Sequence, residues 1–413
     1  MDDKSLYAKL LGLTSPWGVE RVELKLAEGE VHVWVSLPPK QLWVCPGCLW
    51  AAPIHDHRER MWRHLDTFQY RTLIHARIPR LDCPTPGVQQ LRIPWAEEGS
   101  HFTALFEALA IDWMRQAPLS AVAERLHLSW DEAAGIQERA VRRGLARRNL
   151  EPPRYLGIDE TSFQKRHEYV SVVTNLEGTR VLYVADDRTQ ESLDGFWETL
   201  PPEHLASIEA IAMDMWEPYI RSTEAHVPDA RSKIVFDKYH VAQHLNEAVD
   251  KVRRQENREL LADGKSWLKG TKYDWLRNPD NFDLSRWRQF TDLRESILKT
   301  ARAWALKEAA MCLWDLRYLG VVEKNFHAWY GWAIRSRLEP IKRVARMIRN
   351  HWANIKTYFD HRITNAGAES INSKIQKVKY MSRGFRNRKR FRNAIYFHCG
   401  ELDLYPAGAA LVQ

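Results

Sequence analysis

The pattern of polar and apolar residues in the first hundred positions predicts strands and turns. Residues 30–37 alternate in part between polar and apolar side chains, which is typical of a half-buried strand, and Pro38 and Pro39 end that run. A second strand-like stretch runs from Phe68 to Ile78. We therefore predict a small β-rich region at the start of the chain.

The spacing becomes helical after the first hundred residues. Residues 103–148 predict three helices, the first ending before Pro118 and the last beginning after Ser129. Ser129 followed three residues later by Glu132 is a capping-box pattern, which marks the start of a helix. Short helices joined by a tight turn indicate a helix-turn-helix, with an ordinary helical hairpin as the alternative.

From residue 154 short apolar runs alternate with helical segments, which predicts an α/β domain. The turn at 175–178 between two apolar runs marks a hairpin. The expected strands are 155–158, 169–174, 179–185, 208–213 and 233–236, with a helix over 192–200.

The remainder of the chain is predicted to be helical. Residues 241–355 contain eight tryptophans and no convincing strand, so we interpret them as a helical insertion or subdomain. Core packing is the favoured role for most tryptophans of the chain, and DNA contact or pairing of protomers by this insertion stay open as alternatives. A last helix is expected to begin near Thr364. The predicted organisation is a β-rich region at 1–100, a helix-turn-helix region at 101–150, a core at 154–240, the insertion at 241–355, and a final helix with a basic tail at 356–413.

Composition narrows the class of protein. The 413 residues include 61 Lys and Arg against 53 Asp and Glu, a net charge of +8, which fits a nucleic-acid partner. Five cysteines, three of them in the first hundred residues, do not resemble a secreted disulfide framework. The start of the chain lacks the pattern of a signal peptide, and no apolar run reaches the roughly 18–20 residues of a membrane span. We expect a cytoplasmic protein with no membrane partner.

Two acids each follow an apolar strand. Asp159 ends the first predicted strand of the core and Asp214 ends the fourth. Side chains at strand ends meet at the rim of a sheet, where ligands bind, and two neighbouring carboxylates repel each other unless a cation lies between them. Mg²⁺ or Mn²⁺ takes such oxygen ligands, and Glu369 on the last helix would complete the set. The alternative for a single acid after a strand is a helix cap or turn former.

Three nearby residues compete with or flank this set. Asp237 also ends a strand and is a rival metal ligand, although it could equally cap the helix that begins near His240. His240 could contact DNA or a leaving group. Strand alternation is expected to turn Glu160 away from Asp159.

Five motifs surround or follow these acids: Gly157-Ile158-Asp159-Glu160-Thr161, Ala212-Met213-Asp214-Met215-Trp216, Val235-Phe236-Asp237-Lys238-Tyr239-His240, Asn365-Ala366-Gly367-Ala368-Glu369 and Arg383-Gly384-Phe385-Arg386-Asn387. They resemble motifs of the DDE transposases of the ISL-three group of bacterial insertion sequences. The resemblance covers nearly the whole chain, with the motifs in the expected order. It implies an RNase H-like fold, phosphoryl transfer by two metal ions, and a helical insertion between the second and third acids.

The cysteines near the start predict a zinc site that is one ligand short. Cys45 and Cys48 stand at C-x-x-C spacing, and Cys83 is a third ligand. The resemblance implies a fourth Cys or His three residues after Cys83, where this chain has Pro86. Four histidines could substitute, and the alternative is a knuckle held by packing with free thiols. Those histidines are His55, His57, His64 and His75.

Basic residues gather at two places. Arg139, Arg143 and Arg147 are spaced four apart, so they share one helix face and would contact DNA from the helix-turn-helix. A second run follows Glu369 and is interpreted as backbone contact with DNA rather than a solvated surface. Its main candidates are Lys374, Lys377, Arg383 and Arg386.

Together these features predict a DNA transposase that binds the terminal inverted repeats of an insertion sequence, cuts DNA and joins it to a target. A homodimer or higher multimer that pairs two DNA ends is expected, near the bacterial nucleoid. Two alternatives stay open: a catalytically silent DNA-binding protein of transposase origin, and an RNase H-like nuclease without strand transfer.

Overall fold

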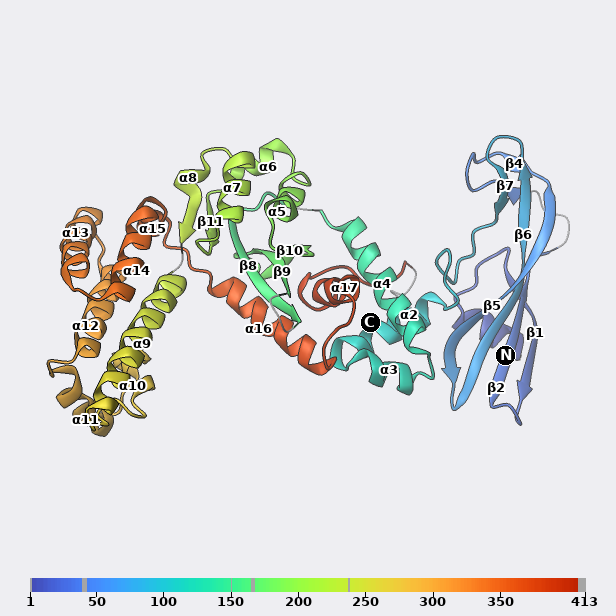
Figure 1. Cartoon of the computed structure of the whole chain (residues 1–413). Helices are drawn as coiled ribbons and strands as arrows, with labels where there is room; N and C mark the ends of the chain where they lie inside the picture. The colour runs from blue at the N-terminus through green and yellow to red at the C-terminus, as the bar shows by residue number, and fades with distance from the viewer. Residues whose placement is uncertain (1, 39–42, 150, 165–167, 237, 408–413) are drawn as a thin grey trace. The chain divides into compact units, whose positions relative to one another are not determined.

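The chain folds into two compact units in the computed structural model, which describes residues 2–38, 43–149, 151–164, 168–236 and 238–407 (Figure 1). The first unit joins residues 1–149 to residues 378–413, and the second spans 150–377. The sequence pattern assigns all of residues 356–413 to the core. The structure corrects this boundary, because residues 378–413 belong to the first unit. The apolar face of the last helix packs in the first unit, a contact that no local pattern reveals.

A mixed sheet begins the first unit. Its strand order is β1-β2-β6-β5, with β7 paired to β6, and β2 runs parallel to β6. Val33, Trp62 and Ile74 are fully buried on this sheet. The predicted strand at 30–37 is confirmed, whereas helix α1 and the long strand β5 were not predicted. The elements are α1 (Asp3–Leu10), β1 (Gly18–Lys25), β2 (Glu30–Ser36), β3 (Trp43–Val44), β4 (Ala51–Ala52), β5 (Ile54–Thr67), β6 (Tyr70–Cys83) and β7 (Gly87–Gln90).

Four helices complete the first unit: α2 (Ala104–Gln116), α3 (Leu119–Arg125), α4 (Trp130–Arg147) and α17 (Arg388–Cys399). The capping box at the start of α4 is confirmed, since the Ser129 side chain accepts from the Glu132 N–H and the Glu132 carboxylate accepts from the Ser129 N–H. The segment after α17 lies close to α4, where a Cβ on Gly144 would stand 2.6 Å from that of Leu402.

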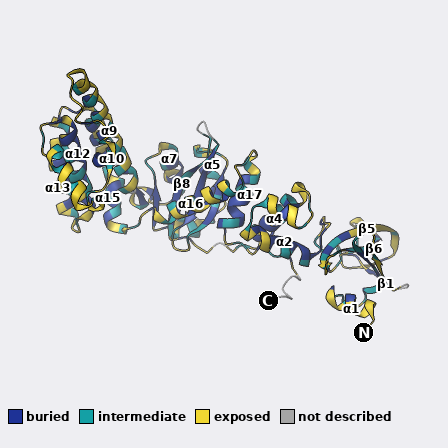
Figure 2. Ribbon diagram, turned by 90° about the horizontal axis from the view of Figure 1, so that it is seen from below, coloured by how far each residue is buried: buried dark blue, intermediate teal, exposed yellow. Residues whose placement is uncertain are grey.

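A five-stranded sheet forms the centre of the second unit. Its order is β10-β9-β8-β11-β12; β8, β9 and β10 are antiparallel, and β11 runs parallel to β8 and β12. Every predicted strand of the core is present, and the hairpin at 175–178 joins β9 to β10. Figure 2 shows buried residues on β8 at the centre of this sheet. The elements are β8 (Tyr155–Gln164), β9 (Glu168–Asn175), β10 (Arg180–Ala185), α5 (Gln190–Trp197), α6 (Pro202–Ser207), β11 (Ala210–Met213), α7 (Glu217–His226), α8 (Ala230–Lys233) and β12 (Ile234–Phe236).

The described residues between β12 and residue 365 contain helices and no strand, as expected for an insertion. Trp275 is fully buried, Trp329 donates from Nε1 to the Leu306 carbonyl at 2.8 Å, and Trp352 stacks on Phe326 at 3.7 Å between ring centroids. The packing role predicted for most of the tryptophans is thereby confirmed. The helices are α9 (Lys238–Ala262), α10 (Lys272–Leu276), α11 (Leu284–Arg294), α12 (Lys299–Met311), α13 (Leu319–Arg335), α14 (Glu339–Asn350) and α15 (Trp352–His361), with 3-10 turns at Pro279–Asn281 and Cys312–Asp315.

The predicted last helix of the core is α16 (Ala366–Met381), and the boundary between the two units falls within it. Ala368, Ile371, Ile375 and Val378 form its buried stripe at helical spacing. Glu369 lies in its first turn. Among the described residues, no helix combines the length and the apolar character needed to cross a membrane.

Candidate active site and DNA-binding elements

Strand register brings the first two predicted acids side by side. β11 pairs parallel to β8 with Met213 opposite Ile158, so Asp214 follows in line with Asp159. Neighbouring strands lie about 4.8 Å apart, and aligned residues point to the same face. Asp159 is partly buried, and the Asp214 side chain is 42% exposed. The predicted end of the first core strand at residue 158 is wrong, because β8 continues to Gln164 and Asp159 lies within it. The sheet therefore presents two adjacent carboxylates, one within β8 and one directly after β11.

Helix α16 lies beside strand β8 (Figure 1). A Cβ on Gly157 would lie 2.8 Å from Asn365 Oδ1 and 3.1 Å from the Ala368 Cβ. Two residues along the strand, the Asn372 amide donates to Asp159 Oδ2 at 2.7 Å. Two strand residues and four helix residues both advance about 6 Å, so the matched contacts continue along both elements.

The next contact of this series joins the Gln376 amide to the Thr161 hydroxyl at 2.9 Å. Glu369 stands three residues before Asn372 and seven before Gln376, which places it on the same side of the helix. The helix face that carries Glu369 is therefore the one that bonds to the strand of Asp159. Asn372 and Gln376 were not predicted as site residues, although the four-residue spacing from Ala368 was a usable signal.

The three acids do not form one tight cluster of ligand atoms. Among the described residues, only Cys45, Cys48 and Cys83, and Glu28, Glu30 and His32, have donor atoms that all lie within 4.8 Å of one another. The second group is explained by ion pairing, because the Glu30 carboxylate bonds to His32 and Arg71. Two-metal sites space their ions about 3.5–4 Å apart, so their outer carboxylates need not meet at this distance. Convergence of Asp159, Asp214 and Glu369 on metal stays a prediction.

Burial dominates the electrostatics of Asp159. It raises the pKa of this carboxyl from 3.8 to about 6, and the Asp214 charge adds to the rise, while the Glu160 N–H and a protonated His240 oppose it. Desolvation disfavours the charged form of a carboxyl, and a nearby cation favours it. Above pH 6 the site therefore carries a poorly solvated negative charge, which suits a bound cation.

His240 lies beside the second acid. Its Nδ1 is 3.7 Å from Asp214 Oδ1, and its side chain is 15% exposed. This contact comes from the first turn of α9, directly after the last strand of the sheet. The rival ligand Asp237 lies outside the described residues.

The opposite face of β8 is held by a separate ion pair. Arg188 lies 3.3 Å from the Glu160 carboxylate, and its guanidinium covers the rings of Tyr169 and Trp216. The expected outward direction of Glu160 is consistent with this pairing. Arg188 was not predicted, because an arginine between a strand and a helix carries no local signature.

Three cysteines form a compact sulfur cluster in the first unit. Cys48 Sγ and Cys83 Sγ are 3.2 Å apart, and Cys45 Sγ accepts the Gly47 N–H at 3.4 Å. Backbone hydrogen bonds from Cys48 and Gly47 lower the pKa of Cys45. The Thr85 N–H also favours the Cys83 thiolate, but burial and the neighbouring sulfurs outweigh it and raise the pKa of Cys83 to about 11. Thiolates oriented by backbone N–H groups fit Zn²⁺, which would offset their mutual repulsion.

Two of the substitute histidines are engaged elsewhere. His64 Nδ1 is hydrogen-bonded to the Thr103 hydroxyl at 2.9 Å, and His75 Nε2 to His32 Nδ1 at 2.8 Å. His55 and His57 are exposed on β5. Within the described residues, no histidine joins the sulfur cluster as a fourth ligand.

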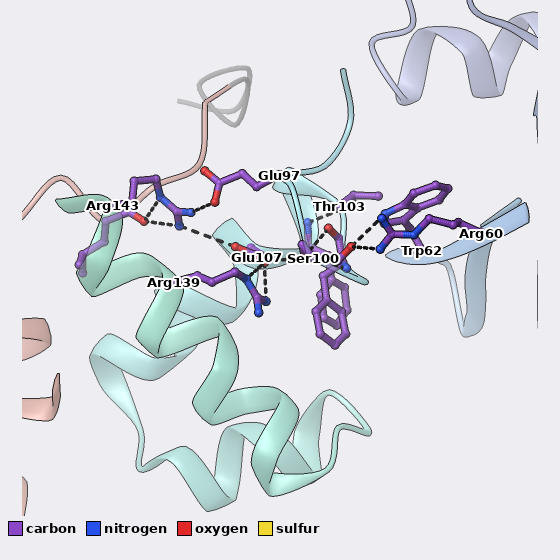
Figure 3. A network of polar contacts seen from close by, with 11 residues as sticks. Arg60, Trp62, Glu97, Ser100, Thr103, Glu107, Arg139 and Arg143 are labelled. Atoms are coloured by element: carbon purple, nitrogen blue, oxygen red, sulfur yellow. Dashed lines mark hydrogen bonds and ion pairs between the residues drawn. The ribbon is translucent and has the colours of Figure 1, made fainter. Parts of the chain in front are cut away.

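The three arginines of α4 share one face, as expected, but each is paired with groups of the first unit: Arg143 is buried, Arg139 is half-buried and Arg147 is exposed. Arg143 is 8% exposed, donates to the Leu404 carbonyl at 3.0 and 2.7 Å, and pairs with Glu97 (Figure 3). Arg139 pairs with the buried Glu107 at 2.6 Å. Arg147 bonds to the Asp403 carboxylate and the Tyr405 carbonyl. This arrangement argues against DNA contact by Arg143, because its donors already have protein partners.

The C-terminal basic residues divide into two groups. Lys389 pairs with Glu138 at 2.5 Å, and Arg390 pairs with Asp131 at 3.0 Å and covers the Trp130 ring. The four predicted DNA contacts are all exposed, and no ion pair to an acid is recorded for them within the described part of the chain. These are Lys374, Lys377, Arg383 and Arg386.

Comparison with known proteins assigns the chain to a class. A transposase family model matches residues 156–395. Residues 41–85 match a model of the zinc finger of the transposases of IS204, IS1001, IS1096 and IS1165. Residues 91–141 match a model of the helix-turn-helix domain of transposase family ISL3. The chain therefore belongs to transposase family ISL3, the ISL-three group that its motifs resemble.

Individual relatives match over almost their whole length. The chain is 26% identical over 396 residues to the transposase for insertion sequence element IS1001 of Bordetella parapertussis, covering 95% of this chain and 97% of the relative. It is 25% identical over 422 residues to the transposase for insertion sequence element IS1557 of Mycobacterium tuberculosis, covering 94% and 93%. The zinc-ribbon, helix-turn-helix and transposase regions occur in the predicted order.

Proposed function

We propose that this transposase binds the ends of an insertion sequence and performs metal-dependent DNA cleavage and strand transfer. The observation that carries the proposal is the register of β8 and β11, which sets Asp159 and Asp214 side by side beneath helix α16 with Glu369 on its facing side. The strand order supports an RNase H-like assignment for this sheet.

Asp159, Asp214 and Glu369 would hold Mg²⁺ or Mn²⁺. Such ions, when bound, activate a water or 3′-hydroxyl nucleophile and stabilise the leaving oxygen of a phosphodiester. The residues of this chain hold the ligands in place: Asn372 fixes one oxygen of Asp159, and His240 lies against Asp214. No covalent intermediate with the protein is needed, because positioning and electrostatics account for in-line displacement.

The DNA contacts are proposed for the exposed basic residues after Glu369. Lys374 and Lys377 follow it on α16, where they would neutralise substrate phosphates. Arg383 and Arg386 continue this run in the first unit, which also contains the helix-turn-helix that would read the terminal repeats. We further propose that the chain acts as a dimer or higher multimer, at DNA in the bacterial cytoplasm.

Two alternatives have different consequences. A catalytically silent DNA-binding descendant would bind element ends without cutting them. An RNase H-like nuclease would cut without joining. Neither explains better than a transposase why two adjacent strands carry Asp159 and Asp214, and why Asn372 of the helix that carries Glu369 bonds to Asp159.

The test is an in vitro reaction of the full chain with element-end DNA and Mg²⁺. Asp159→Asn, Asp214→Asn and Glu369→Gln should each lower cleavage at least a thousandfold, because each removes a proposed metal ligand, and leave the affinity for end DNA within about threefold. Glu203→Gln, at an exposed acid of α6, is the matched control and should cleave at the wild-type rate.

The outcomes separate the three hypotheses. Cleavage followed by joining to a target supports the transposase. Binding without cleavage by the wild-type chain would indicate the silent descendant, and cleavage without joining would indicate the nuclease. Wild-type activity in any one of the three variants would remove that residue from the site.

A further inference from the structure

The zinc-ribbon region has an incomplete second half. Cys45 and Cys48 provide two sulfurs at C-x-x-C spacing, whereas Cys83 is followed at the same spacing by Pro86. Structural zinc sites are almost always tetrahedral and closed by four nitrogen or sulfur ligands. A proline side chain has no donor atom, so this chain contributes three of the four ligands from these positions.

Pro86 lies against the cysteine knuckle, at the sequence position from which a fourth ligand would come. A Cβ built on Gly47 would lie 3.6 Å from the Pro86 Cβ and 3.8 Å from Cys45 Sγ, so the proline ring and the sulfur touch the same point of the knuckle. The pairing of β6 with β7 sets Cys83 opposite Gly87, which folds residue 86 back toward the cluster. The substitution is therefore local, and the surrounding turn is kept.

No neighbouring side chain replaces the missing ligand. The donor group within 4.8 Å contains the three cysteines alone among the described residues. Asp82 is exposed, next to the buried Cys83, as alternation along a strand places it on the opposite face. Thr85 and Pro86 are also exposed. The fourth direction thus opens to solvent, while Cys45 and Cys83 are buried in a small cluster with Trp43, Ala52 and Leu81.

We propose that zinc in this chain is held by three thiolates and that its fourth coordination position, beside Pro86, is taken by an exchangeable ligand from solution. An open position gives an incoming chelator or small thiol direct access to the ion, so the site exchanges zinc faster than a closed four-ligand site. Metal binding by small zinc ribbons is linked to their folding. The folded fraction of this region would therefore rise and fall with the concentration of free zinc.

The test compares the full-length wild type with Pro86→Cys, which completes the second C-x-x-C, and with Thr85→Cys, which adds a thiol one residue away as the matched control. The wild type should hold one zinc per chain. Pro86→Cys should transfer zinc to a competing chelator at a rate about tenfold lower than that of the wild type. Thr85→Cys should transfer zinc at the wild-type rate. Substituted Co²⁺ should give a mixed sulfur and oxygen spectrum in the wild type and a four-sulfur spectrum in Pro86→Cys.

Two results would overturn the proposal. One is a wild type that holds no zinc while Pro86→Cys does, which would make the natural cluster a packed knuckle of free thiols. The other is equal zinc release by the wild type and Pro86→Cys with unchanged Co²⁺ spectra, which would place the fourth ligand elsewhere. Circular dichroism of each variant confirms folding, and no readout depends on DNA cleavage.

Discussion

At the scale of single residues, side chains that were not predicted determine how the predicted ones behave. Asp159 keeps its position because the Asn372 amide and the Glu160 N–H occupy one oxygen each. Burial then raises its pKa to about 6, so the carboxylate is ionised at neutral pH in a setting that solvates it poorly. The carboxylate chosen from sequence as a metal ligand is therefore poorly solvated, and its binding of a metal ion stays a prediction.

His64 gives a pH dependence in the first unit. Burial lowers its pKa from 6.5 to about 4. Between pH 6.5 and about 4, His64 is therefore protonated in the unfolded chain and neutral in the folded chain. Stability is therefore present above pH 6.5 and lost as pH falls toward 4, by about 2 kcal/mol at pH 5. We expect His64→Gln, which can keep a hydrogen bond to Thr103, to reduce this loss in urea unfolding at pH 7.5 and 5.0. Equal pH dependence in both proteins would contradict this role.

At the scale of elements, β8 and α16 are held together by contacts at three successive points. The contacts at Gly157, Asp159 and Thr161 follow one another along the strand, so a shift of the helix at one point moves the residues at the others. At Gly157 the helix comes so close to the strand that an added Cβ would lie 2.8 Å from Asn365 Oδ1. This contact sets how near the helix can come to the strand.

Gly157→Ala should therefore act on both stability and catalysis. Its added Cβ would lie 2.8 Å from Asn365 Oδ1 and from Leu176 Cδ2, which forces α16 outward at a cost of about 1–3 kcal/mol. Cleavage should fall further than the folded fraction, because Glu369 moves with the helix. Gly178→Ala is the control, since its nearest neighbours are 3.8 Å away. Wild-type thermal unfolding and cleavage in Gly157→Ala would show that this approach has no role.

Helix α4 is likewise held by contacts with residues far along the chain, here through its arginine side chains. Its arginine stripe was predicted to face DNA, but Arg143 ties α4 to Glu97 and the Leu404 carbonyl. Helical spacing identifies residues that share a face without identifying what covers it. The partners lie 46 and 261 residues away in sequence, which explains why local patterns gave the stripe and not its role.

Arg143→Ala should lower the free energy of unfolding of the first unit by about 3 kcal/mol, because it leaves buried acceptors without donors. Arg142→Ala, at the exposed neighbouring position, should change it by less than about 0.5 kcal/mol. Urea unfolding measures both. DNA affinity per folded molecule should be unchanged in Arg143→Ala, and a selective loss of DNA affinity at normal stability would restore the DNA-facing interpretation.

At the scale of the whole molecule, local order was predictable and long-range assembly was not. The five core strands, their hairpin, the capping box and the helical insertion each carry a pattern within a few residues. The parallel pairing of β2 with β6, the packing of residues 378–413 in the first unit, and the bond from Asn372 to Asp159 across 213 residues do not. Asp159 and Asp214 were found because both end apolar runs, whereas their ordering partners lie on a helix far along the chain.

The central claim is that Asp159, Asp214 and Glu369 bind the same catalytic metal centre, and Fe²⁺-directed cleavage of the protein backbone tests it most directly. With Fe²⁺ and a reductant in air, radicals formed at the bound ion cut the chain near its ligands. The account predicts cuts around residues 159, 214 and 369 that Mg²⁺ suppresses and that Asp159→Asn weakens at all three places. Cuts near 159 and 214 without any near 369, or cuts that Mg²⁺ does not suppress, would contradict it.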